Sequence, residues 1–543
     1  MSSEVNSENN SCLKADFYQE LMAIVDEAAV LASCSALLGW DEQTFMPPEG
    51  AVHRSNQLAL LAGLHHEKST NPRIGELLDA VEDSRIIHDQ ASPEAANVRE
   101  LRRLYNRQTR LPRTLVEALA RATSLAQQVW VSSRASADFA SFRPHLETII
   151  RLKREEASCL MHALEDSKSS HIPQSPFVSV YDPLLDDYEP GARNAALVTL
   201  FEGLRKDLVP LAAEISEAVR RHANGKSFRG HQDRTESPHS VLTREYPIDR
   251  QRVFVEMVAA AVGFDFRRGR LDVTAHPFCT GVGPGDIRIT TRYDVRQFSD
   301  AFFGVLHEVG HGLYEQGLDP DRFGTPLGDA VSLGVHESQS RLWENAVGRS
   351  KAFWTYWFPL ARQVFPQALH DVTLDQFHAA VNHVVPSLIR VQADEVTYNL
   401  HILIRFELER ALLTGDLPVA DLPSAWNAKY RETLGVVPSN DAEGCLQDIH
   451  WSAGLFGYFP TYTLGNLYAA QLFARADADL GGLDLAFARG EFAGLLGWLR
   501  ENVHRHGKRY SPSALIERAT ATPLDHRPFI ESLRRKYGEL YGI

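Results

Sequence analysis

Two histidines four residues apart are the first candidates for chemistry, in the stretch FFGVLHEVGHGLYEQG at residues 302–317. Apolar residues recur there with helical period, and on a helix His307 and His311 share one face, so both can reach one metal ion. Glu308 points about a quarter-turn away, where it can hold a water without being a ligand. Neutral imidazoles bind Zn²⁺ and an adjacent carboxylate takes a proton from water, so this spacing is typical of zinc hydrolases. The alternative is an ordinary helix with two hydrogen-bonded histidines.

Glu337 is the third ligand that the sequence predicts. A zinc hydrolase needs three protein ligands and an open fourth position. Downstream of the histidines comes a second helical stretch, GDAVSLGVHESQSRLWEN, which contains Glu337. The residues before Glu337 are mostly apolar and small, which argues against a solvated helix glutamate. His336 and Gln339 are neighbours that we expect on other faces of the same helix.

The composition limits the classes of function. Apolar and charged residues make up 44% and 23% of the 543-residue chain, as in soluble globular proteins. The formal charge of −14 argues against a nucleic-acid partner, because phosphate contacts need clustered Lys and Arg. Five scattered cysteines without a C-x-x-C pair indicate free thiols in a reducing compartment. The polar N-terminus lacks a signal peptide, and the nearby run AAVLASCSALLGW is too short to span a bilayer. We therefore expect a cytoplasmic protein without a membrane partner.

Helical period extends over most of the sequence. The exception is DVTAHPFCTGVGPGDIRITTRY at residues 272–293, where two short strand-like pieces flank a Gly/Pro turn and predict a small hairpin. The turn GVGPGD lacks the Gly-Lys-Ser/Thr end of a phosphate loop, so nucleotide binding is not expected. No internal repeat is visible. The sequence predicts one mostly helical unit.

Several sequence blocks together resemble a known family. HEVGH followed by HESQSR is similar to the thermostable carboxypeptidases of the carboxypeptidase Taq family, which are HExxH zinc metallocarboxypeptidases. The blocks DIRIT, IRVQAD and GCLQDIHW agree as well, as do LLGWDEQTFMPPEGA near the N-terminus and FGYFPTYTLGNLYAAQLF near the C-terminus. These blocks appear in family order, from about residue 15 to the C-terminus.

The resemblance implies an architecture and an activity. It implies a mostly α-helical, gluzincin-like subunit with a deep active-site cleft and a small antiparallel β-sheet next to the zinc helix. The chain would consist of a disordered segment over residues 1–14 and a single catalytic domain over 15–543. It would form a homodimer with one Zn²⁺ per subunit, which Co²⁺ can replace. It would release single amino acids from the C-terminus of peptides with broad specificity.

The catalytic roles follow from the chemistry of peptide hydrolysis. Glu308 is the expected general base and proton shuttle. The tetrahedral intermediate needs a second donor facing the metal, and His450 in DIHW and Tyr458 in FGYFPTY are the candidates that the family blocks support. Tyr462 is a weaker candidate. The alternative for each is a packed position in the core.

A carboxypeptidase must also bind a free carboxylate, for which a guanidinium is suited because it binds bidentately. Arg390 in IRVQAD is the first choice, and the alternative is a structural ion pair with Asp394 four residues later. Arg288 in DIRIT could serve instead, and IRIT could pair with a peptide backbone if it is an exposed strand edge. Gln447 is a further candidate for substrate contact, although its amide could equally cap local backbone.

One metal-site partner stays unassigned by the sequence. Thermolysin-like enzymes carry an Asp four residues after the glutamate ligand, where it orients a histidine ligand, but here that position is Arg341.

Three rival functions remain open. A zinc dipeptidyl carboxypeptidase or oligopeptidase would differ only in how far the carboxylate anchor lies from the metal. A di-iron carboxylate protein would use the Glu308-x-x-His311 and Glu501-x-x-His504 pairs. A non-catalytic helical interaction protein would hold no stoichiometric metal.

Overall fold

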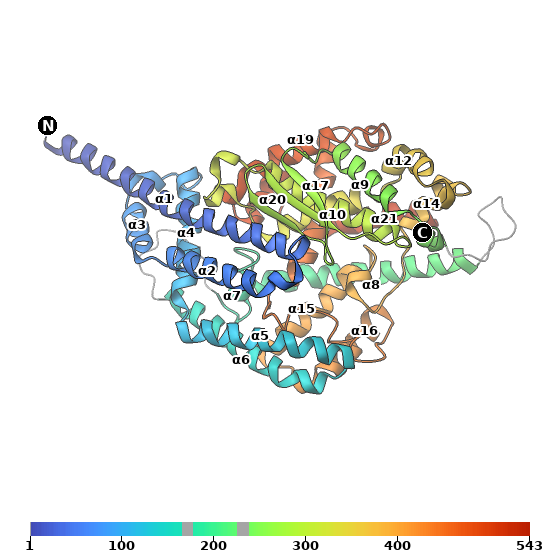
Figure 1. The fold of residues 1–543 in the computed structure, drawn as a ribbon, viewed down its shortest axis with the longest axis horizontal. Helices are drawn as coiled ribbons and strands as arrows, with labels where there is room; N and C mark the ends of the chain where they lie inside the picture. The colour runs from blue at the N-terminus through green and yellow to red at the C-terminus, as the bar shows by residue number, and fades with distance from the viewer. Residues whose placement is uncertain (1, 166–176, 225–237) are drawn as a thin grey trace.

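Helices dominate the computed structural model, which describes residues 2–165, 177–224 and 238–543 (Figure 1). The mostly α fold class that the helical period predicts is confirmed. The α-helices are α1 (Ser2–Thr44), α2 (Ala51–Ser69), α3 (Pro72–Glu82), α4 (Pro93–Arg110), α5 (Arg113–Ser136), α6 (Phe139–Glu165), α7 (Asp182–Leu185), α8 (Asn194–Asn224), α9 (Ile248–Val262), α10 (Phe298–Gly317), α11 (Leu333–Arg341), α12 (Lys351–Val364), α13 (Pro366–Leu369), α14 (Leu374–Val381), α15 (Tyr398–Thr414), α16 (Leu422–Leu434), α17 (Pro460–Asp479), α18 (Asp484–Phe487), α19 (Ala493–Asn502), α20 (Pro512–Thr520) and α21 (Arg527–Tyr541).

Short helical turns connect these elements. One of them, η6 (Leu342–Val347), is a π-helical turn that directly continues α11. The others are the 3₁₀ turns η1 (Pro48–Gly50), η2 (Arg85–Ile87), η3 (Pro238–Thr243), η4 (Pro320–Arg322), η5 (Pro326–Gly328), η7 (Arg390–Gln392), η8 (Val419–Asp421) and η9 (His504–Arg509).

The sheet has three strands, in the order β1-β3-β2: β1 (Gly269–Val273), β2 (Cys279–Gly283) and β3 (Asp286–Thr291). The hairpin that the sequence predicts is present, because β2 and β3 are antiparallel around a turn in which Gly285 has a φ of +80°. The expectation of a purely antiparallel sheet is wrong, because β1 pairs with β3 in parallel. β3 is therefore the central strand, and both of its edges are already paired.

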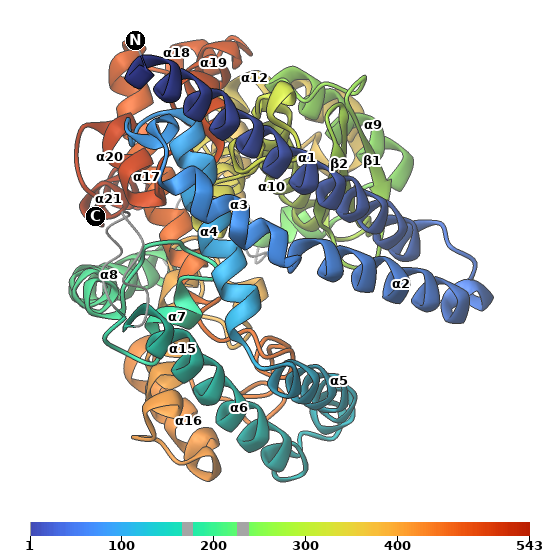
Figure 2. The ribbon, with the colours of Figure 1, turned by 90° about the vertical axis from the view of Figure 1, so that its left-hand side faces the viewer.

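The sheet and α10 lie in one half of the molecule, with α9, α12, α17 and α19, whereas α5, α6, α15 and α16 form the other half (Figures 1 and 2). One large apolar core extends through both halves. α10 belongs to this core because an apolar stripe at helical spacing is buried: Phe298, Phe302, Leu306, Val309 and Leu313.

The N-terminal helices form a smaller packing unit. α1 and α2 lie side by side and α1 crosses over the sheet (Figure 2). A separate small core beneath α1, α3 and α4 includes Leu21, Leu77, Leu78 and Val98. α1 starts at Ser2, inside the segment expected to be disordered. That disorder over residues 1–14, and the single domain over 15–543, stay predictions.

Within the described residues, one stretch of α1, Asp16–Thr44, is long and apolar enough to cross a membrane by length and composition. Only 11% of its most apolar window is buried. Signal sequences and core helices of soluble proteins meet the same criterion, so this stretch is weak evidence for a span.

Candidate metal centre

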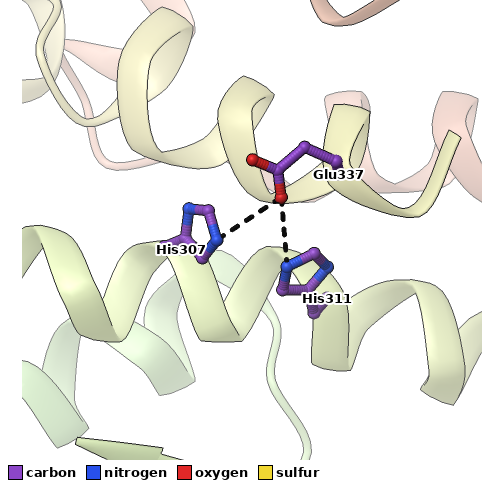
Figure 3. Close-up of side chains that lie close together, drawn as sticks. All are labelled: His307, His311 and Glu337. Atoms are coloured by element: carbon purple, nitrogen blue, oxygen red, sulfur yellow. Dashed lines mark ion pairs between the residues drawn. The ribbon is translucent and has the colours of Figure 1, made fainter. Parts of the chain in front are cut away.

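Three candidate ligands converge between α10 and α11. His307 and His311 point from α10 toward Glu337 on α11 (Figure 3), and one ligand atom from each lies within 4.8 Å of the others. Glu337 Oε2 is 3.6 Å from His307 Nε2 and 3.5 Å from His311 Nε2. Ligands held about 2.1 Å from a tetrahedral Zn²⁺ would lie about 3.4 Å from one another. The spacing and the donor set therefore fit the metal ion that the sequence predicts.

Glycines allow the helices at this site to approach closely. A Cβ on Gly310, between the two histidines, would lie 2.4 Å from the carbonyl oxygen of Gln339 on α11. A Cβ on Gly465 of α17 would lie 2.5 Å from Cγ of Glu337. Real Cβ atoms do not come this near to other atoms, so α11 fits between α10 and α17 only because both positions are glycine.

The other end of α11 is also fixed. Ser332 caps the helix by accepting a hydrogen bond from the N–H of Val335 at 3.1 Å. The N–H of Gly334, in the same first turn of the helix, donates to the buried carboxylate of Glu189 at 3.0 Å. Glu189 also accepts from the hydroxyl of Tyr468 on α17 at 2.9 Å. These bonds fix the N-terminal turn of α11 and so the position from which the Glu337 side chain extends toward α10.

Glu308 is placed for general-base chemistry. Its side chain is buried, and its Oε2 has no hydrogen-bond partner among the described residues. A buried carboxylate oxygen without a partner is costly, which is expected if it faces a bound water or substrate. Burial raises the pKa of Glu308 to about 7, with a further contribution from Glu337. A base with a pKa near neutrality suits proton transfer at neutral pH.

The unassigned partner of His307 is Glu344, which lies on the π-helical turn. Its Oε2 is 3.0 Å from His307 Nδ1 and accepts from Arg341 at 3.2 Å, and its Oε1 accepts from Arg349 at 3.4 Å. Arg341 also donates to Glu337 at 2.7 Å. Burial by itself would raise the pKa of Glu344, but Arg341, His307 and Arg349 lower it to about 2. The sequence offers only one signal for this role, a second glutamate one heptad after the ligand.

His311 has different neighbours. Its ring stacks on that of His336, with centroids 4.4 Å apart and planes at 24°, and His336 in turn contacts Glu315 at 2.9 Å. His336, to which the sequence assigns no role, therefore lies against one of the candidate metal ligands. His311 Nδ1 is buried and has no hydrogen-bond partner within the described part of the chain. Burial, together with His336, lowers the pKa of His311 to about 3, so its imidazole is neutral.

Gln339, by contrast, faces away from the metal ligands, as expected. It contacts the buried His504 at 2.9 Å.

His450, Tyr458 and Tyr462 form one cluster beside the metal ligands. His450 Nε2 is 3.2 Å from the hydroxyl of Tyr462, and the rings of His450 and Tyr458 lie 5.3 Å apart. Burial raises the pKa of Tyr458 and of Tyr462, and the charge of Glu337 adds to the rise for both. Burial lowers the pKa of His450 to about 4. The structure thus brings the two catalytic candidates together.

Arg390 is buried at the edge of this cluster. It pairs with Asp448 at 2.8 Å, donates to the hydroxyl of Tyr398 at 3.0 Å and lies 5.1 Å from the centre of the Tyr462 ring. The alternative of an ion pair with Asp394 is wrong, because Asp394 accepts hydrogen bonds from the loop around Thr397 instead.

Gln447 and Arg288 are less suited to the roles expected of them. The amide of Gln447 is used inside the protein: its oxygen accepts from Arg390 N–H and Arg405, and its nitrogen donates to nearby carbonyl oxygens. These bonds hold the backbone of Arg390 in place and occupy the amide of Gln447 within the protein. Arg288 lies on the central strand β3, so the exposed strand edge proposed for IRIT does not exist. Its guanidinium pairs with Asp286 at 2.8 Å and stacks 4.1 Å from the Trp40 ring.

The di-iron alternative is excluded by the positions of its second pair. Glu501 is exposed and pairs with Arg505, whereas His504 is buried against Gln339. Among the described contacts, neither side chain bonds to His311.

A helical subunit in which an HExxH helix and a glutamate from a following helix converge defines a class, the metallopeptidases with two histidine ligands and one glutamate ligand.

Comparison with known proteins identifies the family. The model of the carboxypeptidase Taq (M32) metallopeptidase family matches residues 20–537. Thermostable carboxypeptidase 1 of Thermus thermophilus is 49% identical over 525 residues, which cover 97% of this chain and 99% of the relative. Carboxypeptidase 1 of Bacillus subtilis is 36% identical over 526 residues, which cover 97% of this chain and 99% of the relative.

Solved structures agree. An M32 carboxypeptidase from Deinococcus radiodurans R1 superposes with a TM-score of 0.88 at 42% identity, over 97% of this chain and 100% of that chain. Trypanosoma cruzi metallocarboxypeptidase 1 superposes with a TM-score of 0.87 at 34% identity, over 96% of this chain and 99% of that chain. The chain therefore belongs to the carboxypeptidase Taq (M32) family, and the resemblance seen in the sequence is confirmed. It is a metallocarboxypeptidase, a peptide hydrolase whose family implies a metal ion.

Proposed function

We propose that this chain holds one Zn²⁺ through His307, His311 and Glu337 and releases single C-terminal amino acids from peptides with broad specificity. The observation that carries the proposal is the convergence of the three ligand atoms beside a buried Glu308 oxygen without a described partner. Co²⁺ would suit the same two imidazoles and carboxylate. When bound, the ion would lower the pKa of a bound water to about 7 and polarise the scissile carbonyl.

The protein side chains would divide the remaining work. Glu308 would take a proton from the attacking water and pass it to the leaving amine. Burial keeps the hydroxyl of Tyr458 protonated, so it can donate to the oxygen on which charge develops, with His450 beside it. Such donors are typically worth about 10²–10³ in kcat. Arg390, oriented by Asp448 and Tyr398, would bind the terminal carboxylate, and Arg288 is the weaker candidate for that role.

The wider setting belongs to the same proposal. A cytoplasmic location without membrane or nucleic-acid partners is supported by the charge of −14 and by the free thiols of Cys34, Cys159, Cys279 and Cys445. A homodimer is supported by apolar side chains left exposed on and beside α1 and α2, with Val52, Leu60 and Phe45 at 78%, 65% and 59% exposure. Sedimentation equilibrium tests it: a mass of one chain would reject the dimer.

The experiment follows amino-acid release from an N-blocked dipeptide and from a longer peptide, for wild type and Glu308→Gln, with the metal content of both. The proposal expects single-residue release by wild type. The variant should keep one zinc and lose about a thousandfold or more in rate. Release of dipeptides would instead favour a dipeptidyl carboxypeptidase. A metal-free, inactive wild type would contradict the proposal and favour a helical interaction protein.

A further inference from the structure

We propose that Glu344 is the positioning residue of the metal centre, which it serves by fixing the ring of His307, and that the π-helical turn η6 places it there. The inference rests on the proposed function, because it concerns the same metal ligands. It assigns to the chain a dedicated orienting carboxylate at a position that differs from the one thermolysin-like enzymes use.

The hydrogen bonds of Glu344 determine how His307 can bind. Arg341 and Arg349 both donate to this carboxylate, so it is ionised and can only accept. The proton between Glu344 Oε2 and His307 Nδ1, 3.0 Å apart, must therefore be on the histidine. The free lone pair of His307 is then on Nε2, the atom that lies 3.6 Å from Glu337 Oε2. One hydrogen bond selects the tautomer that can bind the ion and holds the ring plane.

The π-helical turn explains why the carboxylate is at position 344. It follows α11 without a break and is closed by the N–H of Gly348, which donates to the carbonyl of Trp343 at 2.9 Å, five residues earlier. A π-turn is wider than an α-turn and recurs at functional sites. Gly348 also allows the turn to press on α10, because a Cβ there would lie 2.5 Å from Cδ1 of Leu306. Leu306 immediately precedes His307, so the wide turn brings Glu344 directly against the ligand.

Arg341 joins the positioning residue to the third ligand. Its Nε donates to Glu337 Oε1 at 2.7 Å and its other end donates to Glu344 Oε2 at 3.2 Å. One guanidinium therefore sets the separation of the two carboxylates that contact His307. This explains why the position four residues after the ligand glutamate is an arginine: it carries the bridge, and the orienting carboxylate comes three residues later.

The test measures zinc affinity by competition with a chelator, and does not depend on turnover. Glu344→Gln keeps the shape of the side chain but removes its charge, so we expect zinc affinity to fall about 10- to 100-fold while the metal-free protein stays folded. Glu344→Asp keeps the charge and shortens the reach, so it should lower zinc affinity as well. Glu409→Gln is the matched control: it removes a buried carboxylate that bonds to Tyr181 and Trp451 and to none of the three candidate ligands among the described contacts, so it should bind zinc as wild type does.

The outcomes separate this inference from the proposed function. If wild type binds zinc and both folded Glu344 variants bind it equally well, the positioning role is wrong and the metallocarboxypeptidase stands. If wild type holds no metal, the proposed function fails first. Should both variants fail to fold, cobalt-loaded wild type decides by proton NMR. We expect a hyperfine-shifted, solvent-exchangeable N–H signal from His307 Nδ1, and the absence of such a signal would overturn the assignment.

Discussion

His307 and His311 lie one turn apart on α10 and face the same carboxylate, but the protein treats them differently. His307 donates to an ionised carboxylate that two arginines hold in place. His311 has no such bond in the described structure and is held by ring stacking on His336. Hydrogen bonds to a charged group fix direction, whereas stacking fixes a plane and tolerates sliding. The comparison teaches that the site has a rigid side at His307 and a compliant side at His311.

The largest expected effect comes from a change that disturbs both sides at once. In Gly310→Ala, the new Cβ would meet backbone atoms of Gln339 and Ser340 at 2.4 and 2.6 Å, which cannot move aside as a side chain can. We expect zinc affinity to fall by more than about 100-fold, and overpacking to cost about 1–3 kcal/mol of stability. Chelator competition and thermal unfolding measure the two effects.

Gly304→Ala is the matched control on the same helix, because a Cβ there meets no atom within 4 Å. It should bind zinc as wild type does. Equal zinc affinity in the two alanine variants would show that the close approach of α10 and α11 does not hold the site together.

A change on the compliant side, at His311, should lower zinc affinity less. His336→Ala removes the ring beneath His311, and since a stacked pair is worth about 0.5–1.5 kcal/mol, zinc affinity should fall about 2- to 10-fold. His336→Phe keeps a ring without the bond to Glu315 and should restore most of the loss. Isothermal titration with zinc measures both variants. A loss in His336→Ala as large as that in Glu344→Gln would break the distinction between the two sides.

The smallest effect on the metal centre is expected from Glu189, whose carboxylate accepts a hydrogen bond from the N-terminal turn of α11. Burial raises the pKa of Glu189 to about 7 from an ordinary value of 4.5. The folded state therefore holds the proton of the Glu189 carboxyl group more tightly than the unfolded chain does. The stability that Glu189 contributes is complete below about pH 4.5 and is lost as pH rises through about 7, by on the order of 3 kcal/mol.

Glu189→Gln should remove this slope while leaving zinc affinity nearly unchanged. Urea unfolding of both proteins at pH 5 and pH 8 measures it, and other carboxylates cancel in the comparison. A wild-type free energy of unfolding that falls no more steeply than that of the variant would contradict the assignment.

The parts of the site that follow helical periodicity could be predicted from the sequence. His307 and His311 share a face because of their spacing, and Glu308 lies beside that face for the same reason. Glu337 is a candidate from sequence because it follows on a second helix of small and apolar residues, and the structure brings it to the two histidines. Glu344 was missed because its position depends on a π-turn, which has no signal in helical period.

Long-range pairing was harder still. Arg390 pairs with Asp448, 58 residues away, and not with the nearby Asp394 that helical spacing suggests. That choice depends on tertiary packing, because the stretch forms only the 3₁₀ turn η7. The sequence likewise does not predict that β3 is the central strand. The third strand, β1, is not part of the predicted hairpin and pairs with β3 in parallel. Helical period therefore indicates which candidate ligands can meet, whereas the residues that support them depend on tertiary packing.

The most direct measurement of the central claim is anomalous diffraction at the zinc edge from crystals of the zinc-loaded enzyme. The account predicts one strong peak per subunit, about 2.0–2.2 Å from Nε2 of His307, Nε2 of His311 and a carboxylate oxygen of Glu337. A peak on other residues, or none in a zinc-loaded active enzyme, would contradict it.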